Sequence, residues 1–161
     1  MLTRESKEEE IEYVDEEEIF IEIELVEVKD GDTIKVLKDE EEYSVRLIGI
    51  DSPELYKNKD GEWIEVNEPF SKEAKIFLEN LLKNKQLWLE YDITKKDKYG
   101  RELAYLWVKG KKDKEKIFIN SQMLSNGFAV LMTIPPNVKY VDRLKKAQNE
   151  AKKKKLNLWK K

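Results

Sequence analysis

The sequence contains no cysteine and no histidine among its 161 residues, and these two absences exclude several kinds of site. Disulfides, thiolate or imidazole metal centres, thiol nucleophiles and Ser-His-Asp triads each need one of the two residue types. Any metal ion must therefore be held by oxygen atoms, and any general base must be a carboxylate, a lysine, a tyrosine or water. Apolar runs of about 18 residues are also lacking, so we expect no membrane partner.

Charged residues make up 40% of the chain but are unevenly distributed. Residues 1–28 contain two bases and twelve acids, whereas the rest contains 29 bases and 22 acids. We expect residues 1–17 to be an acidic, flexible lead-in that is too poor in apolar residues to order itself, and residues 18–161 to form one domain. The basic body favours a polyanionic partner. Lys152 to Lys155 fit such a surface and a solvated helix end equally well.

Apolar and polar residues alternate in three short stretches near the start of the domain, which predicts antiparallel strands at 19–25, 33–37 and 43–50. Two further strands are predicted at 87–91 and 103–108. Helical spacing predicts helices at 69–82, with Asn67 as its cap, and at 117–126 and 140–155. Because the helices of βαβ units are missing, we expect an α+β, mainly β fold: a five-stranded OB-type barrel with three helices.

Two stretches of the chain are harder to assign. Residues 128–134 are apolar and fit either a strand or a helix. Residues 56–68 form a polar stretch without clear periodicity, which predicts a long loop. Trp63 lies in this loop and could stack on a ligand, but we favour packing within the loop or the core.

Charged residues that could carry chemistry concentrate in three segments: 30–33 (DGDT), 46–54 (RLIGIDSPE) and 97–101 (DKYGR). Asp32 begins one strand of the predicted hairpin and Asp51 ends the next strand, so both carboxylates, with Glu54, can converge at one rim of the barrel. Close carboxylates repel unless a cation compensates them. An all-oxygen site suits a hard cation, Ca²⁺ before Mg²⁺.

Each segment also has a purely structural interpretation. Asp30-Gly31 is a turn dipeptide, and the stretch around Pro53 can simply stop a strand. Arg46 can be a surface cation on a strand face, and residues 97–101 can be a hydrophilic turn. Taken separately these interpretations are favoured, but the joint occurrence of the three segments in this order and spacing favours a functional site.

The same segments resemble the staphylococcal nuclease, or thermonuclease, family. The similar stretches are 28–36 (VKDGDTIKV), 45–54 (VRLIGIDSPE), 97–105 (DKYGRELAY), 119–129 and 151–159 (AKKKKLNLW). The resemblance implies an OB barrel with three helices and Ca²⁺-dependent hydrolysis of phosphodiester bonds in DNA and RNA. It further implies products with 5′-hydroxyl and 3′-phosphate ends.

Carried over residue by residue, the resemblance assigns the Ca²⁺ ligands to Asp32, Asp51 and the backbone carbonyl of Ser52. It assigns Glu54 as the catalytic carboxylate that orients the attacking water or accepts its proton.

The resemblance assigns phosphate binding to Arg46 and Arg101, whose planar guanidinium groups can donate two hydrogen bonds each to a phosphate. Lys98 and Tyr99 are the expected substrate-binding residues beside Arg101. Thr133 and Pro135 stand where the family has the tyrosines of its base pocket, so base stacking on that side is expected to be weaker.

We expect a monomer that acts on DNA and RNA, with single-stranded or frayed substrates favoured. By resemblance, the protein is extracellular or in the cell envelope if a signal peptide was removed, and cytoplasmic otherwise. The alternative is a non-catalytic nucleic-acid-binding or protein-binding module on the same barrel. A third possibility is an interaction domain that uses the acidic lead-in, for which we favour an aid to solubility over an inhibitory contact with the binding groove.

Overall fold

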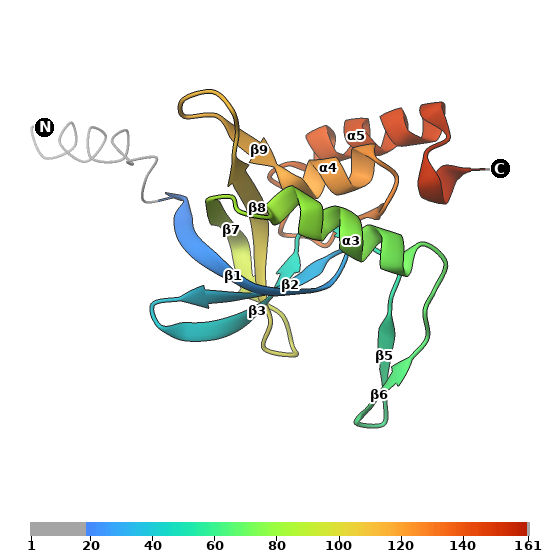
Figure 1. Ribbon diagram of the computed structural model, residues 1–161, viewed down its shortest axis with the longest axis horizontal. Helices are drawn as coiled ribbons and strands as arrows, with labels where there is room; N and C mark the ends of the chain where they lie inside the picture. Colours follow the sequence, from blue (N-terminus) through green and yellow to red (C-terminus); the bar gives the residue numbers. More distant parts are fainter. Residues whose placement is uncertain (1–18, 161) are drawn as a thin grey trace, which may run out of the picture.

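Figure 1 shows the computed structural model, which describes residues 19–160. The expected acidic lead-in at 1–17 lies outside the described residues. The chain forms a barrel from five strands: β1 (Ile21–Asp30), β2 (Thr33–Lys38), β3 (Glu41–Leu47), β7 (Leu87–Lys96) and β8 (Glu102–Lys109). The order β3-β2-β1-β7-β8 is antiparallel throughout, and a parallel pairing of β3 with β8 closes the ring. The predicted five-stranded barrel is therefore confirmed.

Alternation along the strands fills the barrel interior. Ile34 and Val36 of β2, Val45 of β3 and Leu89 and Leu106 of the β7–β8 pair are completely buried. Side chains two residues apart on a strand point to the same face, so this pattern is the expected result of the period-2 sequence. A sixth strand, β9 (Lys116–Phe118), pairs with the end of β8.

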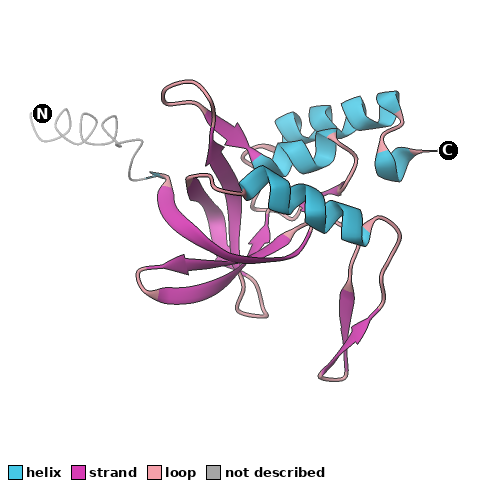
Figure 2. Ribbon diagram, in the orientation of Figure 1, coloured by secondary structure: helices cyan, strands magenta, loops and turns pink. Residues whose placement is uncertain are grey.

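Three α-helices gather on one side of the barrel: α3 (Ser71–Leu82), α4 (Ile119–Ser125) and α5 (Val141–Lys154) (Figure 2). The 3-10 helix η1 (Asn157–Trp159) follows α5 and is half-buried beside the end of α4. The predicted cap of the first helix was wrong: α3 begins after Phe70, and Asn67 lies in the irregular segment before the turn at 69–70. The second helix is also shorter than predicted, because 116–118 joins the sheet as β9 instead.

The predicted third strand, 43–50, is broken in the middle. β3 ends at Leu47, and β4 (Gly49–Asp51) leaves the barrel to pair with β10 (Val130–Met132). Gly49 has φ +84°, a left-handed conformation that glycine adopts without steric cost. A side chain there would also meet Leu144 of α5, whose Cδ1 lies 2.5 Å from an ideal Cβ. The break carries Asp51 away from the barrel wall.

The predicted loop at 56–68 contains an unpredicted hairpin of β5 (Tyr56–Lys59) and β6 (Glu62–Glu65). The hairpin projects away from the barrel and helices (Figure 1), and all eight of its strand residues are exposed. The expectation that Trp63 packs in the core or loop was wrong, since its exposed fraction is 71%. In the described part of the chain, no helix has the length and apolar character needed to cross a membrane.

Asn120 joins α4 to the barrel at the point where β3 gives way to β4. Its side chain is completely buried, accepts a hydrogen bond from the Leu106 N–H at 2.9 Å and donates one to the Ile48 carbonyl at 2.8 Å. Since a buried backbone group without a partner costs about 1–3 kcal/mol, Asn120 stabilises the bend that precedes Asp51.

We predict that Asn120→Ala lowers the free energy of unfolding by about 3 kcal/mol, because it leaves one buried N–H and one buried carbonyl unpaired. Urea unfolding at neutral pH measures the change. Ser121→Ala, at the next residue of α4 and only half-buried, is the matched control and should stay within about 0.5 kcal/mol of wild type. Equal stability of the two variants would contradict the assigned role.

Candidate active site at the barrel rim

The turn between β1 and β2 places Asp32 in the interior of the molecule. Asp32 is 4% exposed; its Oδ2 accepts a hydrogen bond from the Ser52 N–H at 2.7 Å, and its Oδ1 accepts one from the Thr33 hydroxyl at 2.8 Å. Gly31 allows this close packing, because an ideal Cβ there would lie 2.1 Å from Ser52 Oγ and 2.9 Å from the Cβ of Ala74 in α3. The turn is therefore held directly against the segment that follows β4.

The Arg46 guanidinium is the centre of the cluster. Its Nη1 donates to the carbonyl oxygens of Leu47 and Ile50, at 3.0 and 2.7 Å. Its Nη2 lies 3.3 Å from Asp32 Oδ2 and 3.4 Å from Asp51 Oδ1. The side chain is only 11% exposed, so Arg46 is not the surface cation that its strand position alone would allow. One cation thus compensates two carboxylates from different segments.

Glu54 follows shortly after Asp51 and is held by the turn before α3. The Glu54 N–H donates to Glu68 Oε1 at 2.7 Å, and the Glu68 N–H donates back to the Glu54 carbonyl at 3.0 Å. Lys57 Nζ lies 3.3 Å from Glu68 and 4.0 Å from Glu54. These lysine contacts are half-exposed and contribute little to stability. The two hydrogen bonds of the Glu54 backbone are what fix its position.

A second group of residues lies on the turn between β7 and β8. Arg101 Nε donates to Asp97 Oδ2 at 2.8 Å, and Asp97 Oδ1 accepts from the Arg101 and Tyr99 N–H groups. The Tyr99 ring is 72% exposed and lies under two cations, with Arg101 Cζ at 5.5 Å and Lys98 Nζ at 5.2 Å from its centroid. Arg101 itself keeps a third of its side chain exposed.

The structure therefore brings together Asp32, Arg46 and Asp51, with Ser52 beside them. It places Arg101, Lys98 and Tyr99 in a separate group whose recorded contacts, within residues 19–160, are confined to their own turn. The two groups are linked through the parallel β3–β8 pairing, in which Arg46 is opposite Leu103, two residues after Arg101. The two residues at the base-pocket positions, Thr133 and Pro135, are both exposed after β10.

Asp30, which its Asp-Gly sequence predicts to be a turn residue, also belongs to the carboxylate cluster. Burial, followed by the neighbouring Asp32 carboxylate, raises the pKa of Asp30 from 3.8 to about 8. Burial and then Asp32 also raise the pKa of Asp51, and burial raises the pKa of Glu54. The sequence indicates this role of Asp30 only through its position two residues before Asp32. Its burial could not be predicted, because it accompanies the close approach of Gly31 to Ser52 and α3.

The donor set fits Ca²⁺, the metal ion that the family resemblance implies. Carboxylates whose proton affinity is raised by burial and mutual repulsion are the groups that a divalent cation would stabilise. Within the described residues, no three acidic side chains lie close enough to enclose a cation by themselves. Asp32 and Asp51 can therefore hold one side of the ion, which leaves the remaining positions for a backbone carbonyl, water and substrate oxygens.

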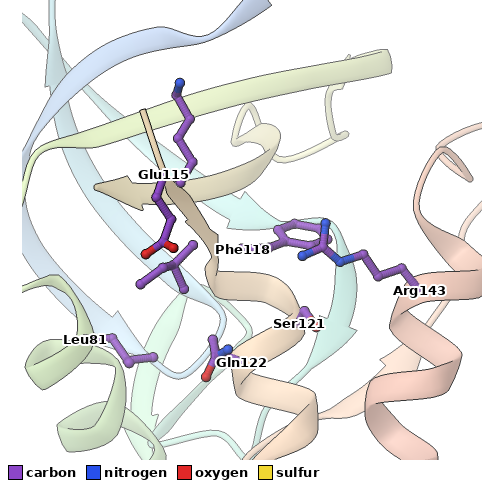
Figure 3. A pocket seen from close by; sticks show the side chains of 8 residues that line it. Leu81, Glu115, Phe118, Ser121, Gln122 and Arg143 are labelled. Atoms are coloured by element: carbon purple, nitrogen blue, oxygen red, sulfur yellow. The ribbon is translucent and has the colours of Figure 1, made fainter. Parts of the chain in front are cut away.

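A separate hollow lies between β9, α4 and α5, where Phe118, Ser121, Gln122 and Arg143 line it (Figure 3). The Arg143 guanidinium covers the Phe118 ring, with its Cζ 5.0 Å from the ring centroid. None of the predicted site residues lines this hollow, so it is distinct from the carboxylate cluster.

Comparison with known proteins agrees with this architecture. Residues 44–161 match the model of the family described as staphylococcal nuclease homologue. The chain is 39% identical to a thermonuclease of Staphylococcus hyicus, over 84% of this chain and 73% of that protein. It is 42% identical to a thermonuclease of Staphylococcus intermedius, over 82% and 72% of the two chains, and 35% identical to endonuclease YncB of Bacillus subtilis, over 82% and 58%. The chain belongs to the staphylococcal nuclease family.

The raised pKa of Asp30 predicts a pH dependence of stability. The folded state retains a proton that the unfolded state loses above about pH 4, so the free energy of unfolding should fall as pH rises from about 4 to about 8. Asp30→Asn removes this contribution and should be more stable than wild type at pH 8 by on the order of 3 kcal/mol.

Urea unfolding at several pH values in excess chelator tests this difference. Asp39→Asn is the matched control, because Asp39 lies in an exposed turn with positive φ, a conformation that asparagine also tolerates. A wild-type minus Asp30→Asn difference that stays constant from pH 5 to pH 8 would contradict the prediction.

Proposed function

We propose that this protein is a Ca²⁺-dependent nuclease that cleaves single-stranded or frayed DNA and RNA as a monomer and leaves 5′-hydroxyl and 3′-phosphate ends. Hydrolysis of phosphodiester bonds follows from membership of the family and from relatives named as thermonucleases and an endonuclease. The metal, the ends and the preferred strand are the proposed part. One observation carries the proposal: a single guanidinium within 3.4 Å of two carboxylates of the cluster.

The chain's own residues have distinct proposed roles. Asp32, Asp51 and the Ser52 carbonyl would hold Ca²⁺, which would neutralise charge on the scissile phosphate and help to activate water. Arg46 and Arg101 would donate to the phosphate oxygens, whose negative charge increases in the five-coordinate transition state.

Glu54 has a carboxylate that is 42% exposed and a pKa raised by burial. It can therefore receive a proton from water without being cut off from solvent. We assign it the orientation or deprotonation of the attacking water.

The alternative function, a binding module without catalysis, is less consistent with the geometry. A protein that only bound nucleic acid would gain nothing from two carboxylates placed beside a phosphate-binding arginine, because they repel the ligand. The arrangement has a use when a cation bridges the carboxylates and the substrate.

We predict that Ca²⁺ supports cleavage of heat-denatured DNA, that Mg²⁺ supports it poorly because it dehydrates reluctantly, and that excess chelator abolishes it. Mass spectrometry of the products of a short oligonucleotide identifies the ends. Asp32→Asn should lose the response to Ca²⁺, whereas Asp39→Asn, in an exposed turn, should keep it. Full activity in excess chelator would exclude the mechanism, and binding without cleavage under all conditions would favour the alternative.

We predict that Arg46→Lys and Arg101→Lys each slow cleavage at least a hundredfold, about 3 kcal/mol, because lysine keeps the charge but lacks the planar fork. The two should differ in stability. Arg46→Lys loses hydrogen bonds to buried carbonyls and should be destabilised by about 2 kcal/mol, whereas Arg101→Lys should change by less than about 0.5 kcal/mol.

Single-turnover cleavage and urea unfolding measure the two effects separately. Arg143→Lys is the matched control, since this exposed arginine on α5 contacts Phe118 far from the carboxylate cluster. Wild-type turnover in both site variants would show that Arg46 and Arg101 are only structural or surface cations.

A further inference from the structure

The β5–β6 hairpin presents two exposed aromatic rings on one of its faces. In the pairing register, Tyr56 is opposite Glu65 and Asn58 is opposite Trp63. Since directly opposed residues and residues two apart share a face, Tyr56 and Trp63 are diagonal neighbours on the same side of the ribbon. Their exposed fractions are 52% and 71%, whereas a folded chain normally covers rings of this size or uses them in an interface.

The base of the hairpin is fixed to the backbone that carries Glu54. The Val66 and Asn67 N–H groups both donate to the Leu55 carbonyl, at 2.9 and 3.1 Å, and the Glu68 N–H donates to the Glu54 carbonyl at 3.0 Å. The ribbon therefore projects from the candidate active site itself, in a direction set by these bonds (Figure 1). From Glu54 to the Asn58–Trp63 level the chain covers at most about 13 Å, at 3.3 Å per strand residue.

We propose that the Tyr56–Trp63 face is a stacking platform for unpaired bases of the substrate strand that lie beyond the scissile phosphate. The inference rests on the proposed nuclease function and adds a substrate-binding site to it. Aromatic rings bind single strands by stacking on bases of any sequence. At about 3.4 Å per stacked nucleotide, the platform is within about four nucleotides of the phosphate whose attacking water Glu54 would orient.

Charge argues that stacking, rather than phosphate attraction, would be the main contribution of the hairpin. Residues 56–65 contain two lysines against three acidic residues. The lysines, Lys57 and Lys59, are on the opposite face from the two rings. Binding to this face should therefore respond weakly to salt, unlike binding through neutralised phosphates. The occupant that fits is an unpaired nucleic-acid strand whose scissile phosphate is already bound in the active site.

The test compares Trp63→Ala, Trp63→Phe and the matched control Ile76→Ala, which shortens an exposed apolar residue on α3. Steady-state cleavage is measured on a long single-stranded oligonucleotide and on a dinucleotide. Trp63→Ala should raise KM for the long substrate about tenfold, with kcat unchanged, and leave the dinucleotide unaffected. Trp63→Phe and Ile76→Ala should stay close to wild type, and the tenfold ratio should be the same at low and high salt.

Binding of the same oligonucleotide, labelled with a dye and followed by fluorescence anisotropy in excess chelator, separates this inference from the proposed function. If wild type cleaves neither substrate, the nuclease proposal fails, but a tenfold weaker binding to Trp63→Ala would still support the platform. If wild type cleaves and Trp63→Ala has the wild-type KM and affinity, the platform is excluded. A wild-type dimer that Trp63→Ala converts to a monomer in sedimentation would assign the face to a second copy of the chain and overturn the inference.

Discussion

The contacts of the Arg46 guanidinium determine both the shape and the charge of the candidate site. At the point where β3 ends, Nη1 binds two backbone carbonyls that would otherwise point into a buried bend, and Nη2 faces two carboxylates. Without this cation, Asp32 and Asp51 would repel each other, and the Asp32 charge, whose side chain is only 6% exposed, would lack a cationic partner, which is strongly destabilising for a buried charge. The side chain proposed to bind phosphate is thus also the one that compensates the two carboxylates proposed to hold the metal ion.

The barrel and most of the site could be predicted from sequence because both depend on local patterns. The alternation that defines β2 and β3 places Asp32 and Arg46 at the rim without knowledge of the rest of the chain. The break at Gly49 could not be predicted, since the alternating pattern continues through Ile50 and the close packing of Leu144 of α5 against Gly49 is a tertiary contact. The exposure of Trp63 could not be predicted either, because it depends on a hairpin whose two strands, within the described residues, pair only with each other.

Another buried carboxylate, outside the candidate site, joins the start of α5 to the barrel. Glu90 of β7 is completely buried and accepts hydrogen bonds from the Trp107 indole, the Tyr140 hydroxyl and the Lys139 ammonium. A buried carboxylate with all its partners in place rigidifies a fold, and its partners come from β8 and from the start of α5. The start of α5, the helix whose Leu144 packs against Gly49, is therefore fixed to β7 and β8 by hydrogen bonds outside the carboxylate cluster.

The closure of the barrel accounts for the relation between the two arginines. Arg46 and Arg101 are far apart in sequence and make different contacts, one with carbonyls and two carboxylates, the other with Asp97 alone among the carboxylates of the described chain. The parallel pairing of β3 with β8 puts their backbones about 7 Å apart along the strand direction, at 3.3 Å per residue. An open sheet would leave them on opposite edges. A phosphate held by both arginines, as the proposed mechanism requires, would thus span the seam of the barrel, where Arg101 is the more exposed of the two and has a single carboxylate partner.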